Sequence, residues 1–203
     1  MNKKRVKLST WLIAVGSLAI LTAGGLFAYN TYSEKEAAEF SVAQAEVLLS
    51  YIEEKEEKPE EQFIEDAVTG AVKKEWVYTI NGTAYIGVLS IPGLRLSLPV
   101  NSEWSYPALK RTPCRFSGDI ESDTLVIAAH NYRQHFANIS RLVPGESVKF
   151  TDADGAVHLY KVMLIEIVEP ERTREVMYSG YDLTLFTCTY GGTARVVVRC
   201  ARV

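Results

Sequence analysis

One uncharged stretch near the N-terminus constrains the architecture of this chain more than any other feature. Trp11–Tyr29 is a run of 19 residues without a charged side chain, and Lys3, Lys4, Arg5 and Lys7 precede it. As a helix it would span about 28 Å, close to the hydrocarbon thickness of a bilayer. Because basic flanks stay in the cytoplasm, the sequence predicts a single-pass cell-membrane protein with its N-terminus inside and the rest outside.

A cleaved signal peptide is the alternative for this segment. The apolar core of a signal peptide is about 7–15 residues long and ends at a small-x-small site. This run is longer and ends in bulky Leu26, Phe27 and Tyr29. We therefore interpret residues 1–10 as a basic cytoplasmic tail and 11–29 as an uncleaved anchor. A globular core helix fits least, because the run is apolar all round.

The segment that follows, residues 30–75, is acidic and has a helical pattern. Glu34 to Asp66 holds twelve acidic and three basic side chains. Apolar residues recur at intervals of three and four, which predicts an amphipathic helix, and Pro59 interrupts the charged run after it. The charge favours a solvated stalk that holds a domain off the membrane. The alternative is a regulatory helix that docks on that domain.

Residues 76–203 have the pattern of an all-β domain. Asp152–Gly155 is a turn sequence between two apolar runs and predicts a hairpin. Short helical pieces fit near 104–109 and 137–142. Many short strands at regular spacing predict a closed or nearly closed β-barrel. The predicted strands are Tyr85–Ile91, Leu94–Leu98, Thr124–Ala129, Ser147–Thr151, Val157–Val168, Leu183–Thr187 and Ala194–Val203.

Charge and cysteine content exclude several functions for this domain. Its charges are nearly balanced, so nothing indicates a nucleic-acid partner. The three cysteines, Cys114, Cys188 and Cys200, lack metal-ligand spacing, so we predict no metal site and no cofactor. An odd number leaves at least one thiol unpaired within the chain. Because disulfides persist outside the cytoplasm, either a Cys114–Cys200 bond or two buried free thiols fits the sequence.

Three chemically active side chains stand where predicted strands begin or end. His130 follows one apolar run, Cys188 closes another, and Arg195 opens the last strand. Each alone has an ordinary structural explanation: a surface imidazole, a buried small thiol, an edge charge. Together they fit nucleophilic catalysis. A thiolate attacks a carbonyl, an imidazole transfers the protons, and a cation stabilises the oxyanion.

The residues around these three resemble the signatures of the sortases. Thr184–Cys188 matches the pattern Thr-Leu-x-Thr-Cys, and Ala128–His130 ends a strand as the sortase histidine does. Arg195 follows Cys188 by seven residues, across the turn into the last strand. Tyr85–Pro92 resembles the first barrel strand of the family, so the resemblance covers most of the predicted domain.

The resemblance implies an eight-stranded sortase-type β-barrel over residues 76–203 and a cysteine transpeptidase activity. The implied substrate is a surface protein with a C-terminal sorting motif of the Leu-Pro-x-Thr-Gly kind. Cys188 would form a thioacyl enzyme, and His130 would protonate the leaving amine and deprotonate the incoming one. Arg195 would stabilise the oxyanion, and Thr187 would contact the substrate. An amine of a Gram-positive cell-wall precursor, or of a pilin, would resolve the intermediate.

The class of sortase stays open. Pilin-polymerising members often carry an Asp-Pro-aromatic lid, whereas Asp66 is followed by alanine here. The segment Glu169–Asp182 is short for the class with a long helix at this place. Some members bind calcium near the site, and Asp119, Glu121 and Asp123 offer carboxylates for it. Acidic loop residues are more often simply solvated.

Two other functions compete with this interpretation. One is a membrane-anchored cysteine peptidase, but papain-like peptidases usually place the cysteine before the histidine, and here His130 precedes Cys188. The other is a non-catalytic binding module of the cell envelope, which has no need for a thiol between a histidine and an arginine.

Spacing selects between two arginines for the role of catalytic cation. Arg195 and Arg199 lie on one face of a regular strand, so parity cannot separate them. Arg199 lies about 13 Å further along, at roughly 3.3 Å per residue. Cys188 and Arg195 flank a short loop between expected antiparallel neighbours. We therefore expect Arg195 in the site and Arg199 as an exposed strand charge.

Overall fold

The computed structural model describes residues 3–57 and 77–203, with side chains for 9–54 and 77–203. The charged run around Pro59, the rest of the predicted stalk and Asp66 lie outside the described residues. The chain divides into two compact units, Met1–Glu36 and Ala37–Val203. One helix, α1 (Lys3–Glu57), contributes to both units.

The first unit is the N-terminal part of α1. The helix is long and apolar enough to cross a membrane, with a mean hydropathy of 1.9 in its most apolar window and none of that window buried. Thr22 and Thr31 donate their hydroxyl protons to Ala19 O and Phe27 O, both at 2.9 Å. Each hydroxyl proton is thus bonded within the helix itself, which suits an apolar environment. The finding agrees with the anchor predicted at Trp11–Tyr29.

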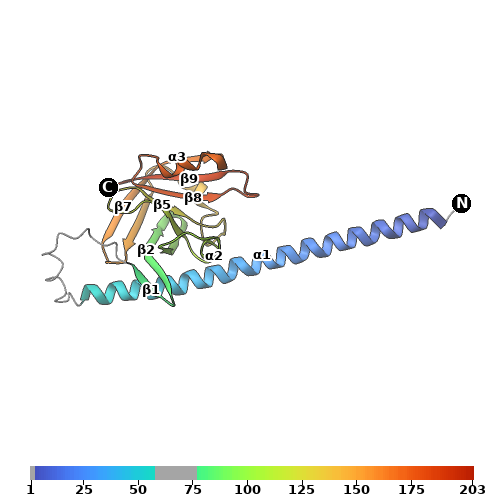
Figure 1. Cartoon of the computed structure of the whole chain (residues 1–203), viewed down its shortest axis with the longest axis horizontal. Helices are drawn as coiled ribbons and strands as arrows, with labels where there is room; N and C mark the ends of the chain where they lie inside the picture. Colours follow the sequence, from blue (N-terminus) through green and yellow to red (C-terminus); the bar gives the residue numbers. More distant parts are fainter. Residues whose placement is uncertain (1–2, 58–76) are drawn as a thin grey trace. The chain divides into compact units, whose positions relative to one another are not determined.

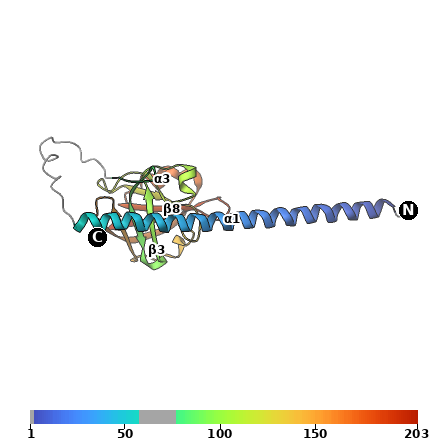
Figure 2. The same cartoon turned by 90° about the horizontal axis from the view of Figure 1, so that it is seen from below.

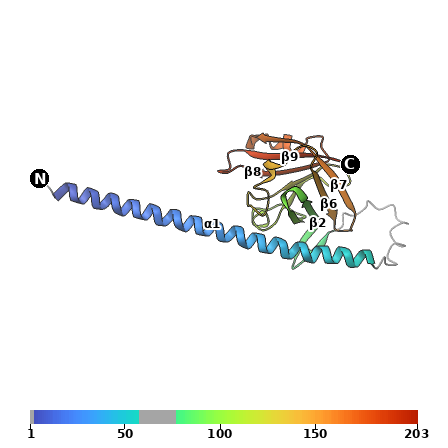
Figure 3. The same ribbon diagram turned by 180° about the vertical axis from the view of Figure 1, so that it is seen from behind.

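The second unit is built on a closed barrel of eight strands. The strands pair in the order β2-β3-β4-β5-β8-β9-β7-β6, and β6 pairs back to β2. Figures 1 and 3 show the barrel from opposite sides. A further strand, β1, adds to the outside edge of β2. The predicted eight-stranded barrel is confirmed. The strands are β1 (Tyr78–Ile80), β2 (Thr83–Ile91), β3 (Leu96–Asn101), β4 (Cys114–Ser117), β5 (Leu125–Ala128), β6 (Ser147–Asp152), β7 (Val157–Val168), β8 (Leu183–Cys188) and β9 (Arg195–Arg202).

Short helices connect these strands. The predicted helical pieces correspond to α2 and η4, and two further short helices lie in the segment between β7 and β8. The helices are η3 (Pro92–Leu94), α2 (Tyr106–Leu109), η4 (Ile139–Arg141), η5 (Pro170–Arg172) and α3 (Thr173–Met177).

The barrel closes where β2 crosses β6, at Gly87. The backbone of Gly87 has φ +150, and a Cβ there would lie 2.2 Å from Thr151 O. The register between β2 and β3 also shifts between Tyr85 and Gly87. Because glycine has no side chain, the two strands can approach closely at this bulge and complete the ring.

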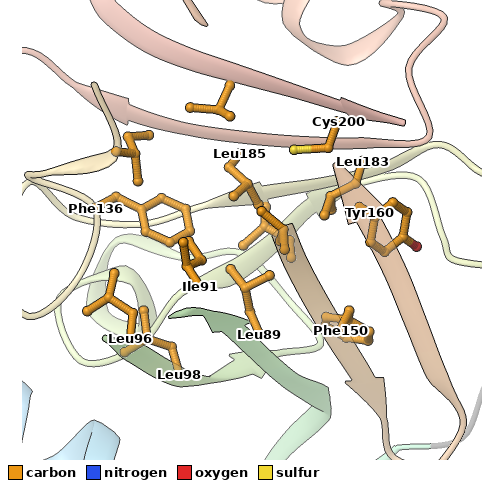
Figure 4. Packing of buried hydrophobic residues seen from close by; sticks show 14 of the residues in the cluster. Leu89, Ile91, Leu96, Leu98, Phe136, Phe150, Tyr160, Leu183, Leu185 and Cys200 are labelled. Carbon is orange, nitrogen blue, oxygen red and sulfur yellow. The ribbon is translucent and has the colours of Figure 1, made fainter. Parts of the chain in front are cut away.

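The inside of the barrel is filled by residues of β2, β3 and β5 to β9 (Figure 4). On β9, Val198 and Cys200 face this core. The same alternation sends the intervening residues to the outer face. The largest buried side chains of this core are Phe136, Phe150, Tyr160, Ile86, Leu89, Ile91, Leu125, Ile127, Ile139 and Leu183.

Two patches of the outer face are covered by helices. Over β8 and β9 lies α3 (Figure 1), where Val176 packs with Val126, Val168 and Val197. The C-terminal part of α1 covers β2 on another side (Figure 2). The barrel therefore has apolar residues on both faces of several strands, and the outer ones are buried by helices.

The covering segment of α1 is Ala37–Ile52. Its buried residues recur every three or four positions: Ala37, Ser41, Gln44, Ala45, Leu48 and Ile52. Leu48 and Ile52 pack on Tyr85 and Val88, and the ring of Tyr51 stacks on Tyr78 at 3.8 Å between centroids. The segment is thus docked on the barrel, which differs from the solvated stalk that its charge favours and matches the docked-helix alternative.

Candidate active site

The pairing of β5 and β8 brings the predicted histidine and cysteine together. These strands are parallel neighbours, with Ala128 opposite Phe186. Ala129 N then donates to Phe186 O at 3.2 Å, which extends the pairing past the end of β5. His130 lies two residues after Ala128, and Cys188 lies two residues after Phe186. Because paired strands lie about 4.8 Å apart, both side chains leave the same edge of the barrel as neighbours.

The antiparallel pairing of β8 and β9 adds the predicted arginine. Cys188 and Arg195 are direct register partners. The loop between them is closed by hydrogen bonds from Thr189 N to Ala194 O at 2.9 Å and from Ala194 N to Thr189 Oγ1 at 3.0 Å. Its tip contains Gly191 with φ +84, a conformation that glycine adopts without strain.

All three side chains emerge on the outer face of the barrel. Ala129 and Leu185 face the core, so the next outward positions along their strands are His130 and Phe186, and Cys188 follows Phe186 by two residues. Cys188 is exposed, and His130 and Arg195 are partly buried. A substrate can therefore reach the thiol from outside.

His130 is held as a neutral imidazole. Partial burial, and then the charge of Lys110, lower its pKa below the ordinary value of 6.5. Its ring stacks on that of Tyr132, with 4.2 Å between centroids and 4° between planes. Near neutral pH the ring can therefore accept a proton from a thiol or an amine.

The guanidinium of Arg195 is turned towards its own loop. Its Nη1 donates to Gly192 O at 3.3 Å and to Ala194 O at 3.2 Å. Both bonds are long, and the acceptors are neutral carbonyls. A developing oxyanion is a stronger acceptor for the same donor, so the side chain can exchange these partners for substrate.

Thr187 has a different position from the one expected. The side chain is 2% exposed, and its hydroxyl donates to Ala129 O at 2.8 Å. This bond ties β8 to the residue before His130. Thr187 thus holds the histidine and cysteine segments together, and the geometry gives its buried hydroxyl no role as a substrate contact.

Arg199 is not the exposed charge that the sequence predicts. It is 3% exposed, and its Nε bonds Glu166 Oε1 at 2.9 Å. The other nitrogens donate to Val176 O, Thr184 Oγ1 and Glu175 O at 2.9–3.2 Å. The expectation failed because α3 covers this part of β9. Arg199 is a register partner of Thr184 and not of Cys188, so it lies away from the predicted site residues, as expected.

Cys114 and Cys200 are both free and buried. Burial raises the pKa of each thiol to about 12. The Cys114–Cys200 disulfide is not formed, because β4 and β9 are separated by β5 and β8 in the sheet. Three strand spacings of about 4.8 Å far exceed the reach of a disulfide.

The acidic loop before β5 is engaged in internal contacts. Asp119 Oδ1 accepts from Ser122 N at 2.7 Å, and Asp123 forms an ion pair with Arg202. Among residues 9–54 and 77–203, no three His, Cys, Asp or Glu side chains are grouped as a metal site would need. The suggested calcium ligands therefore do not form a cluster.

A row of aromatic side chains leads to the thiol along the outer face. Trp104 contacts Phe116 edge-on at 5.8 Å between centroids, and Phe116 contacts Phe186 edge-on at 5.1 Å. Phe186 stands two residues before Cys188 on the same face of β8. We call Trp104, Phe116 and Phe186 the aromatic row. The sequence prediction did not include it, because its members come from three separate segments.

The sequence prediction also did not include Tyr132, which stacks on His130, or His135, which packs against Tyr132. His135 is fully buried, and its ring lies against Tyr132 at 5.6 Å between centroids. Their closeness to His130 in the sequence was the only available signal. A histidine and a tyrosine in a loop are too common for that spacing to indicate a role.

Comparisons with known proteins bear on the same domain. The family model described as "Sortase domain" matches residues 89–203, more than half of the chain. A Clostridium perfringens sortase D5 transpeptidase has a similar structure: the TM-score is 0.54 at 21% identity, over 62% of this chain and 82% of that one. A lid mutant of sortase A from Corynebacterium diphtheriae gives 0.52 at 23% identity, over 60% and 71%.

A structure of sortase C1 from Streptococcus agalactiae gives a TM-score of 0.52 at 26% identity, over 62% of this chain and 70% of that one. A search of curated proteins finds no match to the chain. The similar structures carry the names of three sortase classes, so they share the fold without selecting a class. Because the family model matches more than half of its length, the chain belongs to the sortase family.

Proposed function

We propose that this chain is a membrane-anchored transpeptidase that cleaves the sorting motif of surface proteins and transfers the acyl group to an amine. The observation that carries the proposal is the strand register. Parallel pairing of β5 with β8 makes His130 and Cys188 neighbours, and antiparallel pairing makes Arg195 the partner of Cys188. Their position on one outer face gives a substrate access to all three.

In the first half-reaction, the sulfur of Cys188 attacks the carbonyl of the scissile peptide bond. A C–S bond forms, the C–N bond breaks, and His130 gives the thiol-derived proton to the departing amine. The product is a thioacyl enzyme. The neutral imidazole is suited to this exchange, because its lowered pKa leaves it free to take the proton at neutral pH.

In the second half-reaction, an amine attacks the thioester. Its proton passes to His130, the new amide C–N bond forms, and the C–S bond breaks; His130 then returns the proton to the sulfur of Cys188, which restores the starting thiol and imidazole. Arg195 stabilises the oxyanion in both halves by turning from Gly192 O and Ala194 O to the carbonyl oxygen. A cell-wall precursor or a pilin subunit supplies the amine.

The aromatic row is the proposed surface for the apolar residues of the sorting motif. Phe186 places the end of the row beside Cys188, and Trp104 lies two edge-to-face contacts away. An extended peptide that crosses these rings buries its apolar side chains there and presents the next peptide bond to the thiol.

Membrane attachment fits this role, because both substrates are found at the outer side of the membrane. The apolar part of α1 supports an anchor. The basic tail supports an N-terminus inside and a catalytic domain outside.

The test is incubation of the full chain in detergent with a panel of sorting-motif peptides and an amine that mimics a cell-wall cross-bridge. We expect mass spectrometry to show a peptide–amine product and a thioacyl adduct on Cys188. The Cys188→Ala variant should give neither, and Cys200→Ala is the matched control because that thiol is buried. Product formation by Cys188→Ala would contradict the mechanism. Water as the sole acceptor would indicate the peptidase alternative.

A further inference from the structure

A chain of contacts links the docked helix to the active-site histidine. Ser41, on α1, contacts His135 Nε2 at 3.0 Å across 94 residues of sequence. His135 lies against Tyr132 at 5.6 Å between ring centroids, and Tyr132 stacks on His130 at 4.2 Å. Three successive contacts thus connect Ser41 with His130.

The hydrogen bonds of Ser41 fix the proton on His135. The Ser41 hydroxyl donates its single proton to Arg111 O at 2.7 Å. It must then accept from His135, which places a proton on Nε2 of that ring. Burial and the nearby His130 lower the pKa of His135 to about 4, in agreement with this form. The other nitrogen, Nδ1, has no hydrogen-bond partner among the described residues.

The loop that carries these rings is held from two sides. Phe136, next to His135, is fully buried in the barrel core. His135 N and Ala137 N both donate to Tyr132 O at 3.0 Å, and Phe136 N donates to His130 O at 3.3 Å. The backbone therefore forms a tight turn anchored in the core. The docked helix holds the side chain of His135 from outside.

We propose that Ser41, His135 and Tyr132 are positioning residues for His130, so that docking of Ala37–Ile52 of α1 maintains the catalytic imidazole in its working orientation. The proposal rests on the role of His130 given above. It makes the segment directly after the predicted anchor a supporting part of the active site.

A cation–π pair also joins the docked helix to the segment between α2 and β4. The guanidinium of Arg111 lies 3.7 Å from the ring centroid of Phe40. Arg111 follows Lys110, whose charge acts on His130. The helix thus contacts both the residue beside Lys110 and the ring that supports Tyr132. The ionisable groups near His130 include Lys110, Tyr132 and His135, and Cys188 and Arg195 stand on the neighbouring strand ends.

The test compares two serines of α1 in the full chain in detergent. Ser41→Ala removes the bond to His135, whereas Ser50→Ala removes only a bond to Val47 O of the same helix. With Ser41→Ala we expect kcat to fall about tenfold with little change in KM, since orientation and not substrate binding is affected. Ser41→Thr keeps a hydroxyl and should restore most of kcat, and Ser50→Ala should match wild type.

The second readout does not depend on turnover. In an NMR titration of histidine-labelled protein, we expect the pKa of His130 in Ser41→Ala to rise towards its ordinary value, because the ring loses part of its packing. Tyr132→Leu, which leaves the buried Ser41–His135 bond intact, should cause the same rise. If Ser41→Ala does not fold, the Tyr132→Leu variant provides the test instead.

A His130 titration and a kcat equal to those of wild type, in a folded Ser41→Ala or Tyr132→Leu protein, would overturn the proposal. A wild-type chain that processes no sorting peptide would instead count against the proposed function. The titration would still decide whether the helix acts on His130.

Discussion

Arg195 and Arg199 show how far a residue's role depends on what covers it. Both point to the outer face of β9, as parity predicts. Arg195 lies at the open end beside Cys188. Arg199 lies under α3 and is bonded to Glu166 and to two carbonyls of α3. One guanidinium is available for a substrate, whereas the other is part of the fold.

Substitution of Arg195 should therefore lower activity, whereas substitution of Arg199 should lower stability. Arg195→Ala should lower kcat/KM by about 10²–10³ with unchanged stability, the usual loss for one oxyanion donor. Arg195→Lys should recover only part, because a point charge does not reproduce the planar fork. Arg199→Ala should leave turnover per folded molecule within a few-fold of wild type. Its free energy of unfolding should fall by roughly 2–4 kcal/mol, because buried hydrogen bonds are lost. The loss is not larger because Glu166, left without its partner, is only partly buried.

Steady-state kinetics and denaturant unfolding measure the two effects separately. An Arg199→Ala protein with normal stability and lost activity would contradict the assignment of Arg195 as the catalytic cation.

At the scale of elements, the α1 segment Ala37–Ile52 belongs to the catalytic domain. Leu48 is fully buried against Tyr85 and Val88, whereas its neighbour Val47 is 44% exposed. Leu48→Ala should lower the free energy of unfolding by about 2–5 kcal/mol, the cost of a buried leucine. Val47→Ala is the matched control and should change it by roughly 0.5 kcal/mol or less. Chemical denaturation of the full chain in detergent checks both. Equal effects of the two would show that the segment is solvated.

The contact between this segment and His135 also predicts a dependence of stability on pH. The pKa of His135 is lowered from 6.5 to about 4 in the folded protein, so the unfolded chain binds the proton more readily. Stability should therefore fall as the pH drops from about 6.5 to about 4, by roughly 2–4 kcal/mol at 1.4 kcal/mol per pKa unit. Below that range this group adds no further loss.

In His135→Phe the ring volume remains but the titration does not. Between pH 7 and pH 4, the free energy of unfolding of this variant should fall less than that of wild type. An equal loss of unfolding free energy in the two proteins would mean that His135 does not cause the pH dependence.

Most strands could be predicted because their apolar residues either alternate or, as in β5, form a continuous run. Two strands were missed: β1 has only three residues, and the four residues of β4 include an arginine and a serine, so neither strand forms an apolar run. The strand positions of His130, Cys188 and Arg195, the three proposed catalytic residues, could be predicted because each closes, follows or opens a recognisable strand. Ser41 and His135 could not be paired, since no local pattern encodes a contact across 94 residues. The burial of Arg199 depends on α3, whose five residues give no helical signal.

At the scale of the whole molecule, the chain combines a predicted membrane anchor with a catalytic barrel. External protease on cells with an opened wall should degrade or release a C-terminal tag, while an N-terminal tag should stay protected inside. Immunoblotting of the two tags measures this. A tag at the N-terminus that is equally accessible would contradict the orientation. A mature protein that starts after residue 25 would contradict the uncleaved anchor.

The position of β9 has a consequence for biogenesis. It is the last strand of the barrel in the chain, yet it lies inside the sheet, paired with both β7 and β8. Until residues 195–202 arrive, β7 and β8 are open edges and the core lacks Val198 and Cys200. A ribosome delivers this strand after all the others, so the ring cannot close during synthesis of the preceding part. The same strand brings Arg195 to Cys188. In the proposed mechanism, closing the barrel therefore also completes the catalytic centre, because only β9 supplies its arginine.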